Sequence, residues 1–280
     1  MSSPGNSLRT LSRYYNLNRK DPVKPRIFNC GPGVLSIFTR SSPNTAGANE
    51  DSVGVIPIDN DNVVLMVADG LGGHINGKDA SMLVLDEVRK AVNRARRQGG
   101  VIREAIFKGI ERANRSLMKK LPGAASTIAM VEIQGQSFST YHAGDSEILV
   151  TDKSGDIRYQ SIVHSPVGYA VEAGILDENQ AIMHNERHLV SNVVGDPDMH
   201  ISMTANVELN DDETMLLASD GLFDNLQKNE ITNIIKQGEL LDCSNELYKK
   251  ANTRMYETDS SKPSKFDDLS FILFRLHAHA

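Results

Sequence analysis

The stretch Val63-Val64-Leu65-Met66-Val67-Ala68-Asp69-Gly70-Leu71-Gly72-Gly73-His74 joins an apolar run to a glycine-rich turn. Five apolar residues in succession predict a fully buried strand. The strand ends on the carboxylate of Asp69, and the glycines that follow allow backbone carbonyls to come close to a bound ion. The stretch is typical of a site for a hard cation, although a plain strand followed by a polar turn has the same pattern.

Acidic residues also lie at the ends of three other predicted strands. These residues are Glu50, Asp51, Asp220, Asp267 and Asp268. Acids at strand ends can meet at one edge of a sheet, where their charges repel one another unless cations neutralise them. The repeat of Asp-Gly-Leu at positions 69–71 and 220–222 strengthens the hypothesis of a shared cation site.

The composition predicts an ordinary globular chain and excludes several other classes of protein. Of the 280 residues, 40% are hydrophobic and 24% are charged, and the formal net charge is −6. A negative charge argues against a general nucleic-acid binder. Two cysteines are too few for a disulfide framework, and no apolar run approaches the roughly 20 residues that a membrane span needs. Because the N-terminus also lacks a signal-peptide pattern, we expect a cytoplasmic protein.

The periodicity of the sequence predicts both helices and strands. Apolar residues at helical spacing indicate one helix over residues 80–97 and a second between Val101 and Leu117. Short apolar runs at 127–133, 137–143 and 147–151 predict an antiparallel meander. Asp145 lies in the turn before the last of these runs, where aspartate is also common for purely local reasons.

We expect one domain over residues 26–280, preceded by a loosely attached arm over residues 1–25. Residues 163–200 are polar and contain little core material, which is typical of a flap inserted between strands. Four histidines in this insertion lack metal-ligand spacing, so we interpret them as surface residues. They are His164, His184, His188 and His200.

These motifs occur in the order found in metal-dependent protein phosphatases of the PP2C (PPM) type. The resemblance extends from about residue 36 to 276, and residues 164–165 and 172–175 are similar to the bacterial branch. The motifs that carry it are Asn49-Glu50-Asp51-Ser52, Ala68-Asp69-Gly70-Leu71-Gly72-Gly73-His74, Ser126-Thr127, Gly144-Asp145-Ser146, Ala218-Ser219-Asp220-Gly221-Leu222 and Asp267-Asp268-Leu269-Ser270.

The resemblance implies an α+β fold in four layers, αββα, with two antiparallel sheets packed face to face and helices outside both. It also implies hydrolysis of phosphoserine and phosphothreonine at a centre of two Mn²⁺ or Mg²⁺ ions, with a third ion in bacterial members. In such a centre the metals lower the pKa of a water molecule, which attacks phosphorus.

Matched position by position, the resemblance implies a role for each acidic residue of the motifs. Asp69 would bridge both metals, and Gly70 would offer its carbonyl to one of them. Asp220 and Asp267 would hold the other metal, and Asp145 with Asp220 would hold the third. Glu50 and Asp51 would orient metal-bound waters, and His74 would assist proton transfer to the leaving oxygen.

The chain departs from the family at three positions. Residues 41–49 contain no arginine, although family members carry one there to grip the substrate phosphate; Arg40 is the nearest alternative. Glu147 replaces an arginine, and Asp268 replaces an asparagine. Loss of a phosphate-binding guanidinium would remove about 1.5–3 kcal/mol of charge-assisted hydrogen bonding.

Two hypotheses of different kinds follow. The first is an active phosphatase that acts on phosphorylated proteins, opposes a serine/threonine kinase, is monomeric and binds neither nucleic acid nor membranes. The second is a regulatory module that kept the fold and binds phosphoproteins without turnover. A phosphoesterase with small substrates is a third reading, and activity assays separate the three.

Overall fold

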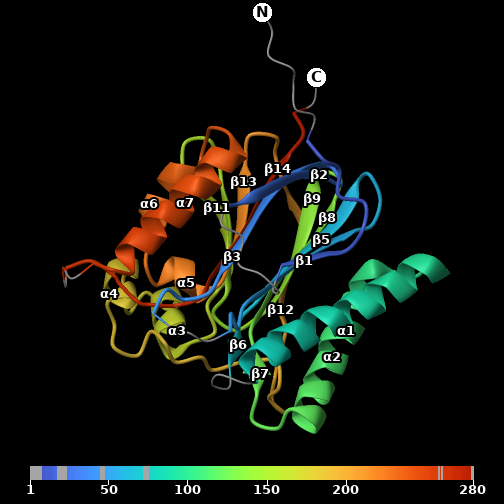
Figure 1. Ribbon diagram of the computed structural model, residues 1–280, viewed down its shortest axis with the longest axis horizontal. Coiled ribbons are helices and arrows are strands. Elements are labelled where there is room, and N and C mark those ends of the chain that lie inside the picture. The colour runs from blue at the N-terminus through green and yellow to red at the C-terminus, as the bar shows by residue number, and fades with distance from the viewer. Residues whose placement is uncertain are drawn as a thin grey trace, which may run out of the picture.

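The computed structural model of this protein describes residues 8–17, 24–44, 48–71, 76–257, 259 and 261–278. Two six-stranded antiparallel sheets lie face to face in it, with helices on both outer sides (Figure 1).

The first sheet is formed mainly by the N-terminal half of the chain. Its strand order is β1 (Tyr15–Leu17), β4 (Ser52–Pro57), β5 (Asn62–Ala68), β8 (Ile128–Gln134), β9 (Ser137–Ala143) and β12 (Ser202–Glu208).

The second sheet combines N-terminal, central and C-terminal strands. Its strand order is β11 (Ile157–Gln160), β10 (Glu147–Thr151), β13 (Thr214–Ala218), β14 (Leu269–Leu276), β3 (Gly33–Arg40) and β2 (Arg26–Cys30). The last strand, β14, lies in the interior of this sheet and pairs with β3 over eight residues, from Leu269 opposite Arg40 to Leu276 opposite Gly33.

The predicted meander over residues 127–151 is wrong in one respect. β8 and β9 pair as expected, but β10 belongs to the second sheet and pairs with β11 and β13. The chain therefore crosses between the sheets at Gly144-Asp145-Ser146. β10 is apolar on both faces, because Ile148 and Val150 face the core between the sheets and Leu149 faces the helices. Such a pattern does not specify which sheet the strand joins.

The apolar run 63–68 is continuous because β5 is covered on both faces. Val63, Leu65 and Val67 pack into the core between the sheets. Val64, Met66 and Ala68 pack on the other face against the helices. The side chains of a strand alternate between faces, so two apolar layers require an unbroken apolar sequence.

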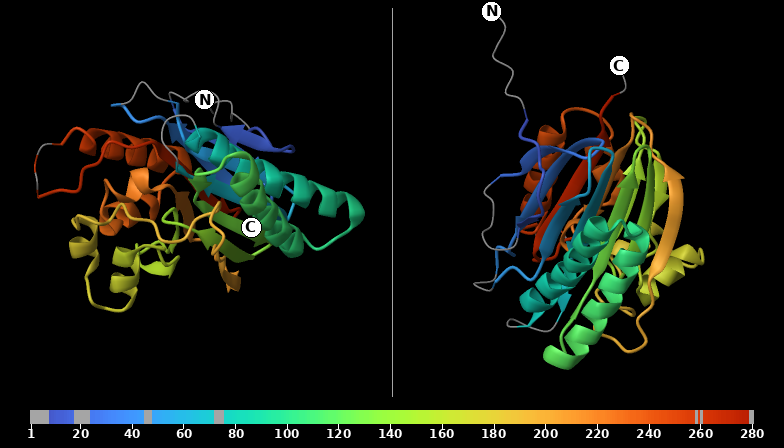
Figure 2. Two further views of the ribbon diagram at one scale, coloured as in Figure 1. Left: turned by 90° about the horizontal axis from the view of Figure 1, so that it is seen from below. Right: turned by 90° about the vertical axis from the view of Figure 1, so that its right-hand side faces the viewer.

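Helices α1 (Gly77–Gln98) and α2 (Ile102–Lys120) cover the first sheet, and Figure 2 shows them packed side by side along it. Gly99 caps the C-terminus of α1, and its φ of 65° lies in the left-handed region that favours glycine. Next to the start of α1, the short strands β6 (Gly70–Leu71) and β7 (Ala125–Ser126) pair with each other. The two predicted helices are confirmed.

Helices α5 (Asp220–Phe223), α6 (Lys228–Ile235) and α7 (Leu240–Arg254) cover the outer face of the second sheet. Between β11 and β12 the chain forms two short helices, α3 (Pro166–Glu172) and α4 (Glu178–Ile182). Among the described residues, no helix is long and apolar enough to span a membrane.

The four-layer αββα sandwich predicted from the motifs is confirmed. The segment 1–25 differs from the expected loose arm, because its residues Tyr15–Leu17 form β1 and pair with β4. The side chain of Leu17 is buried in the core between the sheets, which accounts for this attachment.

Candidate metal centre

Asp69 follows directly after β5, and its main chain is fixed by neutral groups. The N–H of Asp69 donates to Thr127 Oγ1 at 2.9 Å, and the N–H of Thr127 donates to the carbonyl of Asp69 at 2.8 Å. Thr127 Oγ1 also shares a hydrogen bond of 2.7 Å with Ser146 Oγ. These bonds join the ends of both sheets and aim the Asp69 carboxylate at their common edge.

Four other carboxylates act electrostatically on Asp69. Loss of solvent around the half-buried Asp69 side chain raises its pKa, and nearby negative charges raise the pKa further. These charges belong to Asp51, Asp220, Asp267 and Asp145. The structure thus brings together acids from both sheets, as the sequence predicted.

Asp51 and Glu50 lie just before β4, and neighbouring side chains fix both. Ser219 Oγ donates to Asp51 Oδ2 at 2.7 Å. Burial raises the pKa of Asp51, and the charge of Asp268 raises it further. The two carboxylate oxygens of Asp268 accept hydrogen bonds from the backbone N–H groups of Ser42 at 2.7 Å and Glu50 at 2.6 Å. An aspartate accepts both bonds with separate oxygens, which explains its presence where the family carries asparagine.

Asp145 is buried in the turn that crosses between the sheets. Burial raises the pKa of its carboxyl group, and the charges of Asp220 and Asp224 raise it further. The preceding residue, Gly144, donates its N–H to His164 Nδ1 at 3.2 Å. His164 is therefore not a surface residue as predicted; it is buried, and its Nε2 lies 2.9 Å from Ser202 Oγ.

Gly70 and Gly221 follow the two aspartates of the repeated motif, and both lie against backbone. A Cβ at Gly70 would lie 1.9 Å from the carbonyl oxygen of Gly77. A Cβ at Gly221 would lie 1.8 Å from the carbonyl oxygen of Asp268. Only glycine fits at either position, because no real Cβ contact is that short.

Lys265 places its ammonium group among the carboxylates of the second sheet. Its Nζ lies 2.6 Å from Asp220 Oδ2, 2.7 Å from Asp267 Oδ2 and 2.9 Å from Asp224 Oδ2. Burial alone would lower the pKa of Lys265, but the three negative charges outweigh it and raise the pKa. Burial raises the pKa of Asp267 to about 7, even though Lys265 opposes the shift.

The donors of this cluster suit Mn²⁺ or Mg²⁺, because all are carboxylate or carbonyl oxygens. Asp145 Oδ1 and Asp220 Oδ1 are buried without a hydrogen-bond partner among the residues that the structure describes. Within the same residues, however, no group of three or more His, Cys, Asp or Glu side chains is arranged to hold a metal ion. Lys265 stands between three of these carboxylates and supplies a positive charge there.

Arg40, the nearest alternative to the missing arginine, contacts Tyr248 of α7. Its Nη1 donates to the hydroxyl of Tyr248, and its guanidinium carbon lies 5.5 Å from the centre of the Tyr248 ring. Residues 45–47, in the loop between β3 and β4, lie outside the described residues. Gly72, Gly73 and His74 also lie outside them.

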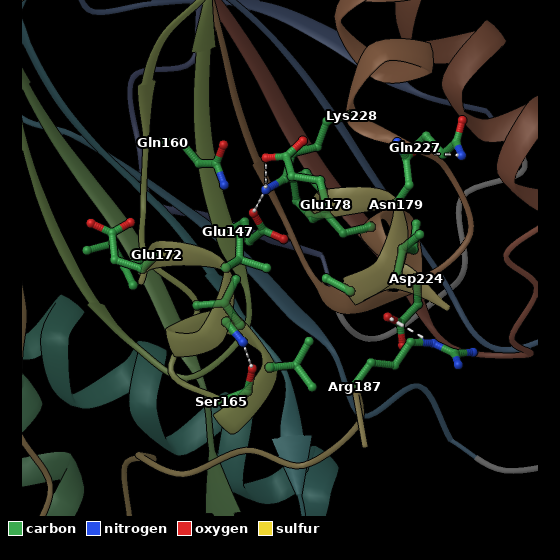
Figure 3. A pocket seen from close by; sticks show the side chains of 18 of the residues that line it. Glu147, Gln160, Ser165, Glu172, Glu178, Asn179, Arg187, Asp224, Gln227 and Lys228 are labelled. Carbon is green, nitrogen blue, oxygen red and sulfur yellow. Dashed lines mark hydrogen bonds and ion pairs between the residues drawn. The ribbon is translucent and has the colours of Figure 1, made fainter. Parts of the chain in front are cut away.

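Glu147, which replaces another arginine of the family, is buried and pairs with a cation from α6. Lys228 Nζ lies 3.5 Å from Glu147 Oε2 and 3.1 Å from Glu178 Oε1 (Figure 3). Burial raises the pKa of Glu147, and the charge of Lys228 opposes the shift. Lys228 thus ties α4 to β10 and to the start of α6.

A cavity of about 440 Å³ lies between α3, α4 and the start of α6. Figure 3 shows Glu147, Lys228 and Glu178 on one side of it and Arg187 with Asp224 on another. Arg187 Nε lies 3.6 Å from Asp224 Oδ1. Because Asp224 also contacts Lys265, the cavity is adjacent to the carboxylate cluster.

The motifs missed two residues of the cluster, Asp224 and Lys265. Asp224 lies four residues after Asp220, so a helix at that point places both on one face. Lys265 lies two residues before Asp267 in a polar loop without periodicity, where no sequence signal assigns it a direction.

Comparisons with known proteins identify relatives of this chain. The sequence model of the protein phosphatase 2C family matches residues 44–253. A putative protein phosphatase 2C-type of Streptococcus pyogenes is 29% identical over 204 residues, which cover 68% of this chain and 80% of the relative.

Solved structures share the fold. The serine/threonine phosphatase Stp1 of Staphylococcus aureus superposes with a TM-score of 0.73 at 24% identity, over 91% of this chain and all of that chain (100%). The catalytic domain of the serine/threonine phosphatase PstP, in complex with two manganese ions, superposes with a TM-score of 0.66 at 19% identity, over 87% and 98% of the chains. With the family match over most of its length, the chain belongs to the metal-dependent protein phosphatases of the 2C family.

Proposed function

We propose that this phosphatase hydrolyses phosphoserine and phosphothreonine in proteins at the cluster around Asp69. The observation that carries the proposal is the convergence of five carboxylates from both sheets on one edge. Asp69, the carbonyl of Gly70, Asp220 and Asp267 would hold two Mn²⁺ or Mg²⁺ ions. Asp145 with Asp220 would hold a third.

When bound, such ions supply a water of lowered pKa as the nucleophile. The residues around them would orient that water and exclude other reactions. Ser219 fixes the Asp51 carboxylate, so Asp51 can accept hydrogen bonds from water in a set direction. Asp268 fixes the backbone from which the Glu50 side chain extends. His74 is proposed to pass a proton to the leaving oxygen.

The substrate segment next to the phosphate would lie in the cavity beside Asp224. This cavity carries both signs of charge and an apolar side formed by Val167, Val171 and Ile182. We extend the proposal to residues 163–200 as the flap that covers bound phosphoprotein. A serine/threonine kinase would supply the substrate, because hydrolysis consumes phosphorylated side chains.

The test is Mn²⁺-dependent hydrolysis of p-nitrophenyl phosphate and of a phosphothreonine peptide. We expect Asp69→Asn and Asp220→Asn to lower the rate by more than about 100-fold, since residues that merely support metal ligands commonly contribute 10–100-fold. Asp212→Asn is the matched control, because Asp212 pairs with Lys153 on the surface. Equal rates in all four proteins, or no hydrolysis with Mn²⁺, would contradict the proposal.

The orientation of Arg40 toward Tyr248 favours a second candidate function, a module that binds phosphoproteins without turnover. Retention of the clustered acids argues against it, because a scaffold has no need of them. Saturable binding of the phosphothreonine peptide in Mn²⁺, with no release of phosphate, would support the module.

The remaining proposals concern the setting of the protein. We propose a cytoplasmic monomer with one domain, which includes strand β1 in addition to residues 26–280. Cys30 and Cys243 are both buried free thiols, which suits a reducing compartment. Light scattering on the purified chain tests the monomer, and a mass of two or more chains would contradict it.

A further inference from the structure

We propose that Lys265 is a tethered cation that occupies the position of one catalytic metal ion and must withdraw before that ion binds. The inference rests on the proposed function, because it concerns the ion assigned to Asp220 and Asp267. It adds a regulatory property to this chain: a threshold for metal binding set by its own lysine.

The first argument is the identity of the contacted atoms. One nitrogen, Lys265 Nζ, lies within 2.7 Å of an oxygen of Asp220 and an oxygen of Asp267. These are the two residues proposed to hold the same ion. Mg²⁺ binds carboxylate oxygens at about 2.0–2.1 Å, so a metal between them would overlap the ammonium group. The two cations also repel each other strongly at such a separation.

The second argument is the way the main chain of Lys265 is held. Its N–H donates to Asn225 Oδ1 at 2.9 Å, and its carbonyl accepts from Asn225 Nδ2 at 2.9 Å. Asn225 Nδ2 also donates to the carbonyl of Gly221 in α5. The backbone of Lys265 is thus anchored to the helix that carries Asp220, and exchange with a metal must occur by rotation of the side chain.

The third argument is that such a rotation is open to the side chain. The Lys265 side chain is 27% exposed, so a path to solvent exists. Its four-carbon stem is flexible, and the ammonium group regains water when it leaves the carboxylates. Asp224, the third partner at 2.9 Å, also pairs with Arg187 of the segment 163–200. Release of Lys265 would therefore change the charge balance at that segment as well.

The experiment compares Lys265→Met with a matched control, Lys262→Met. Lys262 lies in the same loop and pairs with Glu257 away from the cluster, so the variant makes the same change in net charge. Calorimetric titration of the full chain with Mn²⁺, after removal of metals with EDTA, measures each binding step. We expect Lys265→Met to bind one Mn²⁺ at least about tenfold more tightly than wild type, and Lys262→Met to match wild type.

A second measurement uses the wild-type chain, so it does not depend on whether a variant folds. Lysines are reductively methylated in EDTA and in Mn²⁺, and peptide mass spectrometry measures the modified fraction of each. We expect Mn²⁺ to increase modification of Lys265 several-fold and to leave Lys262 unchanged. Unchanged Mn²⁺ affinity in Lys265→Met, or methylation of Lys265 that does not respond to Mn²⁺, would overturn the inference.

Neither measurement depends on turnover. A chain that binds Mn²⁺ and releases Lys265 but fails to hydrolyse phosphopeptides would refute the proposed function and support the inference. A chain that hydrolyses phosphopeptides, but whose Lys265 methylation does not change with Mn²⁺, would support the proposed function and refute the inference.

Discussion

The tripeptide Asp-Gly-Leu occurs twice at the rim of the cluster, and its two copies fold differently. After Asp69 the chain forms strand β6, and the aspartate is held through its backbone by Thr127. After Asp220 the chain forms helix α5, and the aspartate is paired through its side chain with Lys265. One half of the site is thus supported by neutral donors, and the other by a cation.

A short motif therefore determines which residue lies at the site. The charges around that residue depend on partners that are distant in sequence. Both copies need their glycine, because backbone approaches within 2 Å of the missing Cβ in each. In the described residues Asp69 has no ion pair, whereas Asp220 has one. Four sets of substitutions test this contrast, and we expect the size of the effect to decrease from the first to the last.

Gly70→Ala and Gly221→Ala should each lower the free energy of unfolding by about 3 kcal/mol, because the added methyl group meets backbone that must shift. Urea denaturation measures the loss. Gly100→Ala is the control, since its Cβ would meet Ala95 at an ordinary 3.5 Å. If either glycine variant is as stable as the control, the two copies do not share this constraint.

Asp69→Asn and Asp220→Asn should differ in EDTA. The pKa of Asp69 is raised by burial and by like charges, so neutralising it should raise the free energy of unfolding at pH 7.5. The increase in the free energy of unfolding should be smaller for Asp220→Asn, because this variant also loses the ion pair with Lys265. Thermal unfolding in EDTA measures both, and equal gains would remove the contrast between the two halves.

Acid should destabilise the fold through His164, which contacts Gly144 and Ser202. Burial lowers the pKa of His164 to about 3, below its usual value near 6.5, so the unfolded chain takes up the proton first and stability falls as pH drops below 6.5. Between pH 7.5 and 5.5 this histidine should contribute a loss of about 1.4 kcal/mol. His164→Asn should lose that much less than wild type over the same interval in urea denaturation, and an identical loss would exclude His164 as the cause.

Asp268→Asn should have the smallest effect. An amide retains one acceptor oxygen for the N–H groups of Ser42 and Glu50, so about 1 kcal/mol of stability should be lost with one hydrogen bond. Amide hydrogen exchange at Glu50 should become faster. Unchanged exchange would show that the carboxylate is not what positions Glu50.

The family resemblance of the motifs predicted the four layers. The sequence itself located the clustered acids, because they lie at the ends of predicted apolar strands. It could not assign β10 to a sheet, since a strand with two apolar faces fits either one. It placed His164 on the surface because its partners, Gly144 and Ser202, are distant in sequence. Lys265 was missed for the same reason: its direction depends on Asn225, forty residues away in sequence.

The position of β14 has a consequence for the order of assembly. This strand is the last one among the residues that the structure describes, yet it lies between β13 and β3 in the interior of its sheet. Asp267 and Asp268, which precede it, reach the cluster only when β14 has inserted. During synthesis from the N-terminus, earlier strands must therefore wait with unpaired edges, and such edges expose a growing chain to aggregation. The proposed metal site, which includes Asp267, is therefore completed only when β14 is in place.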